Sequence, residues 1–242
     1  MNRLPSQVKS FFEELKPLLP ASKTCEAVIF AAGPLIPSVL RYTKDLHVSA
    51  GGQDVSAHEF GAYTGEVAAE MLSDLNVKYC IVGHSERRQY FGETDQQVND
   101  KAHRLLRNGI TPVICVGESL NHREQGLTMD VVNYQLKSAL AAMDAAQTKK
   151  CVIAYEPLWA IGTGHTATAE QAEEVCAELR EIIRKIHGAR IARSVSILYG
   201  GSMNEKNCEE LLSMPDIDGG LIGGASLKPQ EFAKIIAATA TE

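Results

Sequence analysis

The stretch AYEPLWAIGTG, Ala154 to Gly164, joins an apolar run to a carboxylate, a proline, a tryptophan and a glycine-rich segment. Cys151 to Ile153 precede it, so the run is typical of a buried strand that ends at Glu156. The residues Pro157 to Thr166 that follow are typical of a loop. The pattern therefore predicts a strand whose end presents a carboxylate to a cavity, beneath a loop that closes over it.

Short β-branched runs alternate with helical patterns along the chain. The predicted strands are Glu26 to Ala31, His47 to Ala50, Lys78 to Val82, Thr111 to Val116, Cys151 to Tyr155, Ser194 to Tyr199 and Gly220 to Ile222. The predicted helices are Ser6 to Leu15, Gly65 to Leu75, Gln96 to Asn108, Met129 to Ala145, Ala169 to His187, Glu205 to Ser213 and Pro229 to Ala238, with a short one near Ile36 to Tyr42.

Apolar strands flanked by helices predict a parallel sheet. No Pro/Ser-rich linker or shift in composition divides the chain, so we predict a single α/β domain over residues 1–242. Periodicity alone leaves a closed barrel and an open doubly wound sheet as alternatives.

The composition narrows the class of partner. The formal net charge is -6 and the Lys and Arg residues are scattered, which argues against a nucleic-acid groove or an anionic membrane surface and favours a small-molecule ligand. The six cysteines show no C-x-x-C spacing, which is typical of a reducing compartment. No apolar segment resembles a signal peptide, so we expect a cytoplasmic protein.

In parallel α/β folds, polar residues at the carboxyl ends of strands carry the chemistry. Taken alone, His84 is more simply interpreted as a histidine that hydrogen-bonds to nearby backbone groups. Glu156 alone is more simply interpreted as a carboxylate with a structural role. Together, on different strands, they can face one ligand, the carboxylate taking a proton while the imidazole polarises an oxygen. The predicted strand ends carry Gln53, His84, Glu118, Glu156, Ser202 and Gly223.

Two segments near the C-terminus suit an anion. YGGSM, Tyr199 to Met203, and LIGGASLKP, Leu221 to Pro229, each place paired glycines at a strand end, where backbone amides can surround phosphate oxygens. One Gly-Gly pair is as readily a turn. Two pairs at the last two strands favour a phosphate site.

The segments AYEPLWAIGTG, GHSERRQYFGETD, ILYGGSM and LIGGASL, in this order, closely resemble the triosephosphate isomerase family. The likeness runs from about Gln53 to the C-terminus. It implies a (β/α)₈ TIM barrel, here with its first strand absent. It also implies an isomerase of glycolysis and gluconeogenesis that interconverts dihydroxyacetone phosphate and D-glyceraldehyde 3-phosphate, with no metal and no cofactor.

The resemblance assigns the catalytic roles known for this family. Glu156 corresponds to the base that moves a proton between two carbons, and His84 to the neutral electrophile on the carbonyl oxygens. Glu86 corresponds to a glutamate of the family's site. Ser85 is expected to cap and begin a helix whose N-terminus disfavours the charged imidazole.

The resemblance also assigns ligand contacts and the lid. The backbone amides of Gly162, Ser202, Gly223 and Gly224 would hold the phosphate. The lid loop would include Pro157, Trp159, Gly164 and Thr166. Core packing is the alternative role for Trp159.

The segment Gln53 to Gly65 corresponds to the loop that docks into a second subunit, with Thr64 near its tip, which implies a homodimer. Asp54 departs from the family, which usually has asparagine there. Cys115 and Tyr199 match positions that support the site.

The pattern breaks at the N-terminus. The family begins with a strand leading into Asn-x-Lys-Met-Asn, whose lysine binds substrate, and Met1-Asn2 match only the end of this motif. We expect no substitute from Arg87 or Lys228. Impaired turnover of this chain is therefore expected, as are unpaired strand edges near Val28 and Leu221.

The leading hypothesis is an isomerase shortened at its N-terminus. The alternative from another class is a non-catalytic relative that binds phosphorylated ligands or a protein partner. A different phosphate-binding barrel enzyme is a weaker alternative, because it would not require AYEPLWAIGTG.

Overall fold

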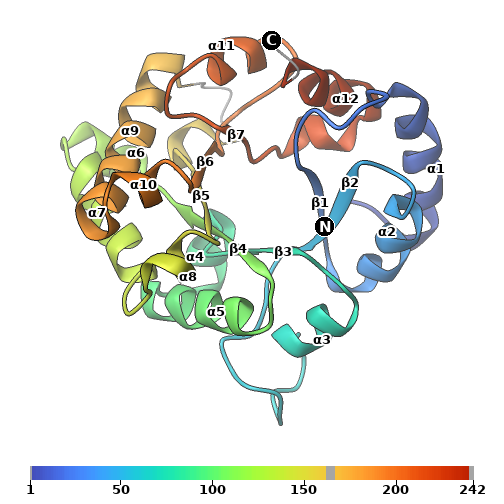
Figure 1. Cartoon of the computed structure of the whole chain (residues 1–242), viewed down its shortest axis with the longest axis horizontal. Coiled ribbons are helices and arrows are strands. Elements are labelled where there is room, and N and C mark those ends of the chain that lie inside the picture. Colours follow the sequence, from blue (N-terminus) through green and yellow to red (C-terminus); the bar gives the residue numbers. More distant parts are fainter. Residues whose placement is uncertain (1, 162–166, 240–242) are drawn as a thin grey trace.

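The fold is a curled parallel sheet inside a ring of helices, seen in a computed structural model that describes residues 2–161 and 167–239 (Figure 1). The seven strands pair in chain order, each parallel to the next. The predicted α/β barrel fold is thereby confirmed. The strands are β1 (Ala27–Ala31), β2 (Val48–Gly52), β3 (Tyr79–Val82), β4 (Thr111–Val116), β5 (Val152–Tyr155), β6 (Ser196–Tyr199) and β7 (Gly219–Gly220).

Helices connect successive strands and cover the outside of the sheet (Figure 1). The α-helices are α1 (Pro5–Leu15), α2 (Ile36–Thr43), α3 (Ala69–Asp74), α4 (Ser85–Phe91), α5 (Asp95–Arg107), α6 (Leu120–Glu124), α7 (Thr128–Ala139), α8 (Ala145–Thr148), α9 (Ala169–His187), α10 (Ala189–Ala192), α11 (Cys208–Leu212) and α12 (Pro229–Ala238). The described residues also form four short 3₁₀ helices, η1 (Lys16–Leu18), η2 (Gly33–Leu35), η3 (Leu158–Ala160) and η4 (Gly224–Leu227).

Several predicted helix boundaries are wrong, and local hydrogen bonds explain why. The helix predicted from Gly65 begins only at Ala69, because the Val67 carbonyl accepts from the Ser56 amide instead of continuing a helix. The helix predicted from Glu205 begins at Cys208, because the Asn204 side chain accepts from the Lys206 amide in a turn.

Two further differences concern the ends of elements, and a third concerns short helices. The helix predicted to reach Ala145 ends at Ala139, and Ala142 adopts the left-handed conformation with φ 59°. The last strand lies at Gly219–Gly220 and not at Gly220 to Ile222, although the Leu221 amide still donates to the Tyr199 carbonyl. The short helices α6, α8 and α10 were absent from the predicted set, whereas the helix expected to begin at Ser85 is present as α4.

The sheet has two apolar faces. Its outer face and the helices form the larger core, which includes Leu136, Ile153 and Leu179. Its inner face carries a small separate cluster of Ile81, Val113, Cys115 and Ala154. Because side chains alternate along a strand, Ile153 points outward while its neighbour Ala154 points inward. The inner cluster leaves only small or short side chains beneath the carboxyl ends of β4 and β5.

The ring of helices continues across the region between β1 and β7, where the described strands do not pair. Among the described residues β1 pairs only with β2, and β7 only with β6. Helix α1 nevertheless packs against both α2 and α12, and Phe12 stacks on Tyr42 with ring centroids 6.0 Å apart. The Arg3 guanidinium donates to the Leu227 carbonyl and lies over the Phe11 ring. The helical layer therefore spans the seam between β1 and β7.

All six cysteines are free thiols, and five of them are buried. Burial raises the pKa of Cys151 to about 12 and raises those of Cys80 and Cys115 well above the ordinary value of a thiol. These thiols behave as small apolar groups in the core. No helix in the described part of the chain is sufficiently long and apolar to cross a membrane.

The seam predicts uneven protection of the backbone amides. In hydrogen exchange monitored by mass spectrometry, amides of β4 and β5 should exchange slowest, because both strands are paired on two sides. Amides of β7 and the unpaired edge of β1 should exchange about a hundredfold faster or more. Equal protection of β4 and β7 would show that the seam is closed in solution.

Candidate active site

Glu156 follows β5 directly and lies almost entirely out of solvent, with 2% of its surface exposed. Its amide donates to the Val116 carbonyl at 2.8 Å, which continues the pairing of β4 and β5 by one residue. Two glycines make room for it. A Cβ atom on Gly117 would lie 1.8 Å from the Glu156 carbonyl oxygen, and one on Gly200 would lie 2.9 Å from its Cγ. Glu156 is therefore packed closely against the main chain at the carboxyl end of the sheet.

Donors from two other strands surround this carboxylate. The His84 Nε2 atom lies 3.1 Å from Oε1, the Ser85 amide donates to Oε2 at 2.9 Å, and the Ser85 hydroxyl donates to Oε1 at 3.2 Å. The Cys115 thiol, from the inner face of β4, also donates to it. The structure thus brings together the predicted pair, His84 and Glu156.

The surroundings of Glu156 make its carboxylate more basic than an exposed carboxylate. Burial raises the pKa of Glu156 above its ordinary value of 4.5, while His84, Ser85 and Cys115 partly oppose the shift by stabilising the charged form. A carboxylate with a raised pKa takes up a proton from a weak carbon acid more readily than an exposed one.

The contacts of His84 fix its neutral tautomer. His84 is the N-cap of α4, and its Nδ1 atom accepts from the Glu86 amide at 3.3 Å. Because Nδ1 accepts, the neutral ring carries its proton on Nε2, the atom that faces Glu156. The expected helix does begin at Ser85, but the prediction that Ser85 caps it is wrong: Ser85 is the first helical residue, and both of its donors face Glu156.

Glu86 lies on the opposite side of the imidazole. Its side chain is 70% exposed, and its Oε2 atom is 3.8 Å from His84 Nδ1. It therefore does not share the enclosed space around Glu156, and its predicted role in the site rests on its proximity to the ring.

Glu118, at the end of β4, holds the segment that leads into the predicted lid. This fully buried carboxylate accepts from Trp159 Nε1 at 2.8 Å, from the Tyr155 hydroxyl at 3.1 Å and from Arg123 at 3.3 Å. Arg123 also lies over the Trp159 ring, 4.7 Å from its centroid. Trp159 packs partly buried against the large core. Sequence reasoning placed Glu118 at a strand end but assigned it no role.

The surroundings of the two glycine pairs differ, so the two pairs are needed for different reasons. A Cβ atom on Gly201 would lie 2.1 Å from the Tyr199 hydroxyl, so packing accounts for the first pair. Nothing lies within 4 Å of a Cβ atom built on Gly223 or Gly224, both of which are exposed. Their amides, and that of Ser202, donate to no acceptor within the described residues. The second pair thus leaves open space beside free donors, which is what an anion requires.

The end of β6 and the start of the predicted lid are connected. The Ser202 hydroxyl donates to the Ala160 carbonyl at 2.7 Å. The predicted lid and phosphate residues Gly162, Gly164 and Thr166 lie outside the described residues. Pro157, at the start of the predicted lid, precedes the short helix η3.

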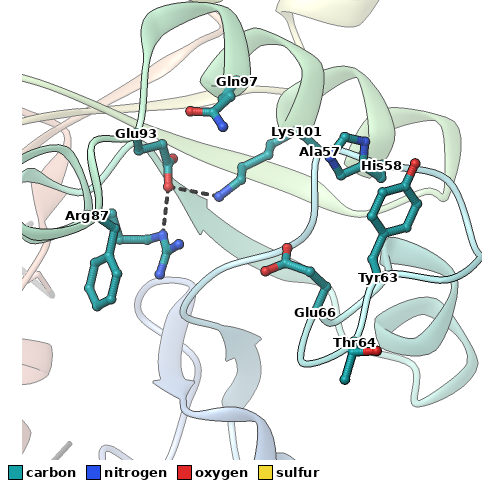
Figure 2. A pocket seen from close by; sticks show the side chains of 10 residues that line it. Ala57, His58, Tyr63, Thr64, Glu66, Arg87, Glu93, Gln97 and Lys101 are labelled. Atoms are coloured by element: carbon teal, nitrogen blue, oxygen red, sulfur yellow. Dashed lines mark hydrogen bonds and ion pairs between the residues drawn. The ribbon is translucent and has the colours of Figure 1, made fainter.

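The predicted docking loop, Gln53 to Gly65, projects from the sheet end and borders a cavity of about 320 Å³ (Figure 2). Thr64 lines this cavity, and His58 stacks on Tyr63 with centroids 4.1 Å apart. Asp54 forms ion pairs with Arg87 and Lys101 at 2.8 and 2.7 Å. The cavity lies beside Glu93 and is not lined by Glu156.

Several cations that could otherwise replace the family's lysine already have partners. Arg87 pairs with Glu93 and Asp54, Lys228 with Glu231, and Lys23 with Glu26. In the described ranges, no group of three or more His, Cys, Asp or Glu side chains is arranged to hold a metal ion.

The chain is similar to a family of known proteins over nearly its whole length. The family profile described as triosephosphate isomerase matches residues 1–239. A triosephosphate isomerase from Acetivibrio thermocellus is 50% identical over 235 residues, covering 97% of this chain and 93% of that protein. Another from Thermus thermophilus is 49% identical, covering 98% and 94%, and one from Clostridium novyi is 45% identical with the same coverage.

The raised pKa of Glu156 predicts that the carboxylate lowers stability at neutral pH. A group whose pKa is higher in the folded state stabilises the fold below its unfolded pKa, near 4.5, and this contribution is lost as the pH rises through the folded pKa. Glu156→Gln should therefore melt at a higher temperature than the parent at pH 7, with the gap narrowing toward pH 4. The control Glu13→Gln, at an exposed position, should show no such trend; a gap independent of pH would contradict this.

Proposed function

Since this chain belongs to the triosephosphate isomerase family, we propose that Glu156 and His84 carry out its proton transfers. The reaction interconverts dihydroxyacetone phosphate and D-glyceraldehyde 3-phosphate. The observation that carries the assignment of roles is the 3.1 Å contact between the buried Glu156 carboxylate and His84 Nε2. A base and a proton donor on separate strands then face the same small space.

In the proposed mechanism, the Glu156 carboxylate removes a proton from the carbon beside the carbonyl group. The electron pair moves to the carbonyl oxygen, which the Nε2 proton of His84 polarises, and an enediolate forms. In the free protein Nε2 faces the carboxylate, so a bound substrate oxygen would replace Glu156 as its acceptor. His84 then passes its Nε2 proton to the enediolate oxygen and takes the proton of the neighbouring hydroxyl, while protonated Glu156 returns its proton to the neighbouring carbon. The two oxygens thereby exchange roles, and the isomerisation is complete without net gain or loss of protons.

We propose that Gly223, Gly224 and Ser202 bind the phosphate through their backbone amides, together with Gly162. The free amides and the open space beside the Gly223–Gly224 pair support this. Closure of the Pro157–Thr166 loop would exclude water and keep the enediolate from losing phosphate. The anchoring of Trp159 to Glu118 gives this loop a fixed starting point.

We further propose a cytoplasmic homodimer, whose subunits each form one domain and meet through the Gln53–Gly65 loop. Large apolar side chains on and near that loop support this: Phe60, Tyr63, Tyr90 and Phe91 are 47–70% exposed. Such a group of exposed aromatic residues is typical of a contact surface.

Shortening the base tests the mechanism. Glu156→Asp withdraws the carboxylate from the reacting carbon by one methylene group, which should reduce kcat by about 10²-fold in a coupled assay. Glu170→Asp, at an exposed position on α9, is the matched control and should retain full activity. An unchanged rate in Glu156→Asp would remove Glu156 as the base.

The lysine of the family's N-terminal motif gives a second test. Extending the chain by about a dozen residues that carry Asn-x-Lys-Met-Asn should raise kcat by about 10²-fold or more, because a preorganised cation stabilises the enediolate. The same extension with methionine in place of the lysine should restore the strand but not the rate. No gain in either case would favour the non-catalytic alternative, which the engagement of nearby cations elsewhere supports.

A further inference from the structure

Gly83, immediately before His84, is held through both of its peptide groups. The Gly83 amide donates to Glu93 Oε1 at 2.9 Å, and the Gly83 carbonyl accepts from Arg88 Nε at 2.8 Å. Gly83 has φ 71°, and a Cβ atom there would lie 2.8 Å from Val98. Because these two peptide groups direct the chain into His84, their positions set where the imidazole points.

Glu93 is a buried anion sustained by its neighbours. Its side chain is 3% exposed and accepts from Arg87 Nε at 2.6 Å and from Lys101 Nζ at 2.8 Å, as Figure 2 shows. Burial alone would raise the pKa of Glu93, but Lys101, Arg87 and the Gly83 amide outweigh burial and lower it. Glu93 therefore presents a charged acceptor to Gly83, which makes a stronger hydrogen bond than a neutral one.

The two cations are shared with Asp54. Arg87 Nε lies 2.8 Å from Asp54 Oδ2, and Lys101 Nζ lies 2.7 Å from Oδ1. The cluster therefore contains two acids and two bases, and its formal charge is zero. Lys101 is only 5% exposed, so loss of either acid would leave an uncompensated charge next to the other.

We propose that Glu93 is a positioning residue for His84, and that Asp54 completes the charge cluster that holds Glu93 in place. The cluster of Asp54, Arg87, Glu93 and Lys101 thereby couples the start of the Gln53–Gly65 loop to the imidazole. This inference rests on the proposed role of His84 in the reaction. The carboxylate of Asp54 supplies a negative charge that an asparagine at this position would lack.

A cluster that served stability alone would behave differently. Its loss would lower the melting temperature but would leave the Gly83 amide and the turnover number of the folded protein unchanged. A positioning role requires that the Gly83 amide and the His84 ring change together, and kcat should change with them because His84 takes part in the proposed reaction.

Glu93→Gln is the principal test, because glutamine retains an acceptor of similar size but removes the charge. In amide spectra of the isotope-labelled chain, the Gly83 proton should move upfield and exchange about tenfold faster. The His84 imidazole signals should shift or broaden. In a coupled assay kcat should fall about tenfold, with KM within about twofold, because a misdirected electrophile weakens the transition state more than substrate binding.

Asp54→Asn is the second variant, and it keeps the experiment decisive if Glu93→Gln does not fold. It should shift the Gly83 amide in the same direction by a smaller amount and lower kcat about threefold. The matched control is Asp218→Asn. The Asp218 carboxylate likewise bridges an arginine, Arg180, and a main-chain amide, that of Ile197, but its partners lie on α9 and β6. This control should leave the Gly83 amide and kcat unchanged.

The outcomes separate this inference from the proposed mechanism. Unchanged Gly83 and His84 signals in a folded Glu93→Gln or Asp54→Asn protein would overturn the positioning role, even if the melting temperature fell. Shifted signals with an unchanged KM and kcat would support the positioning of the ring but count against the catalytic role of His84. Equal shifts in Asp218→Asn would also overturn the proposal, since they would reflect general loosening.

Discussion

The structure depends on keeping one carboxylate ionised where almost no water reaches it. Glu156 is 2% exposed, and its two oxygens are instead contacted by His84, by both donors of Ser85 and by the Cys115 thiol. These groups come from β4 and from the turn after β3, so the sheet must bring three strand ends together before the charge is tolerated. The same contacts that allow the carboxylate to be buried also hold it beside the imidazole, so the fold and the proposed chemistry depend on one set of interactions.

Local sequence patterns predicted the parts of the fold whose causes are local. The range of α9 was predicted to the residue, because Thr168 and Gln171 form a capping box at its start and Gly188 follows its end. The range of β4 was predicted equally well from its continuous apolar run. The start of helix α4 at Ser85 was expected from the resemblance, but its capping residue was not, because the cap is an imidazole, a residue type outside the usual capping set.

The candidate site likewise has features that could be predicted from the sequence and features that could not. The pairing of His84 and Glu156 could be predicted, because strand ends of a parallel sheet meet at one edge. The cluster of Asp54, Glu93 and Lys101 could not, because its members are separated by up to 47 residues and no periodic pattern connects them. The two glycine pairs looked alike in sequence, yet contact with Glu156 and Tyr199 requires the first pair while open space surrounds the second.

Because the thiols are buried, their reaction with a reagent would report how often the sheet opens. Cys80 and Cys115 lie in adjacent strands, are inaccessible to solvent and have pKa values raised by burial, so a thiol-specific reagent reaches either only while the surrounding sheet is separated. Cys25, just before β1 at the seam, is only half-buried. The alkylation rate of Cys25, divided by that of Cys80 or Cys115, would therefore measure how often the two edges of the sheet separate at the seam relative to its centre.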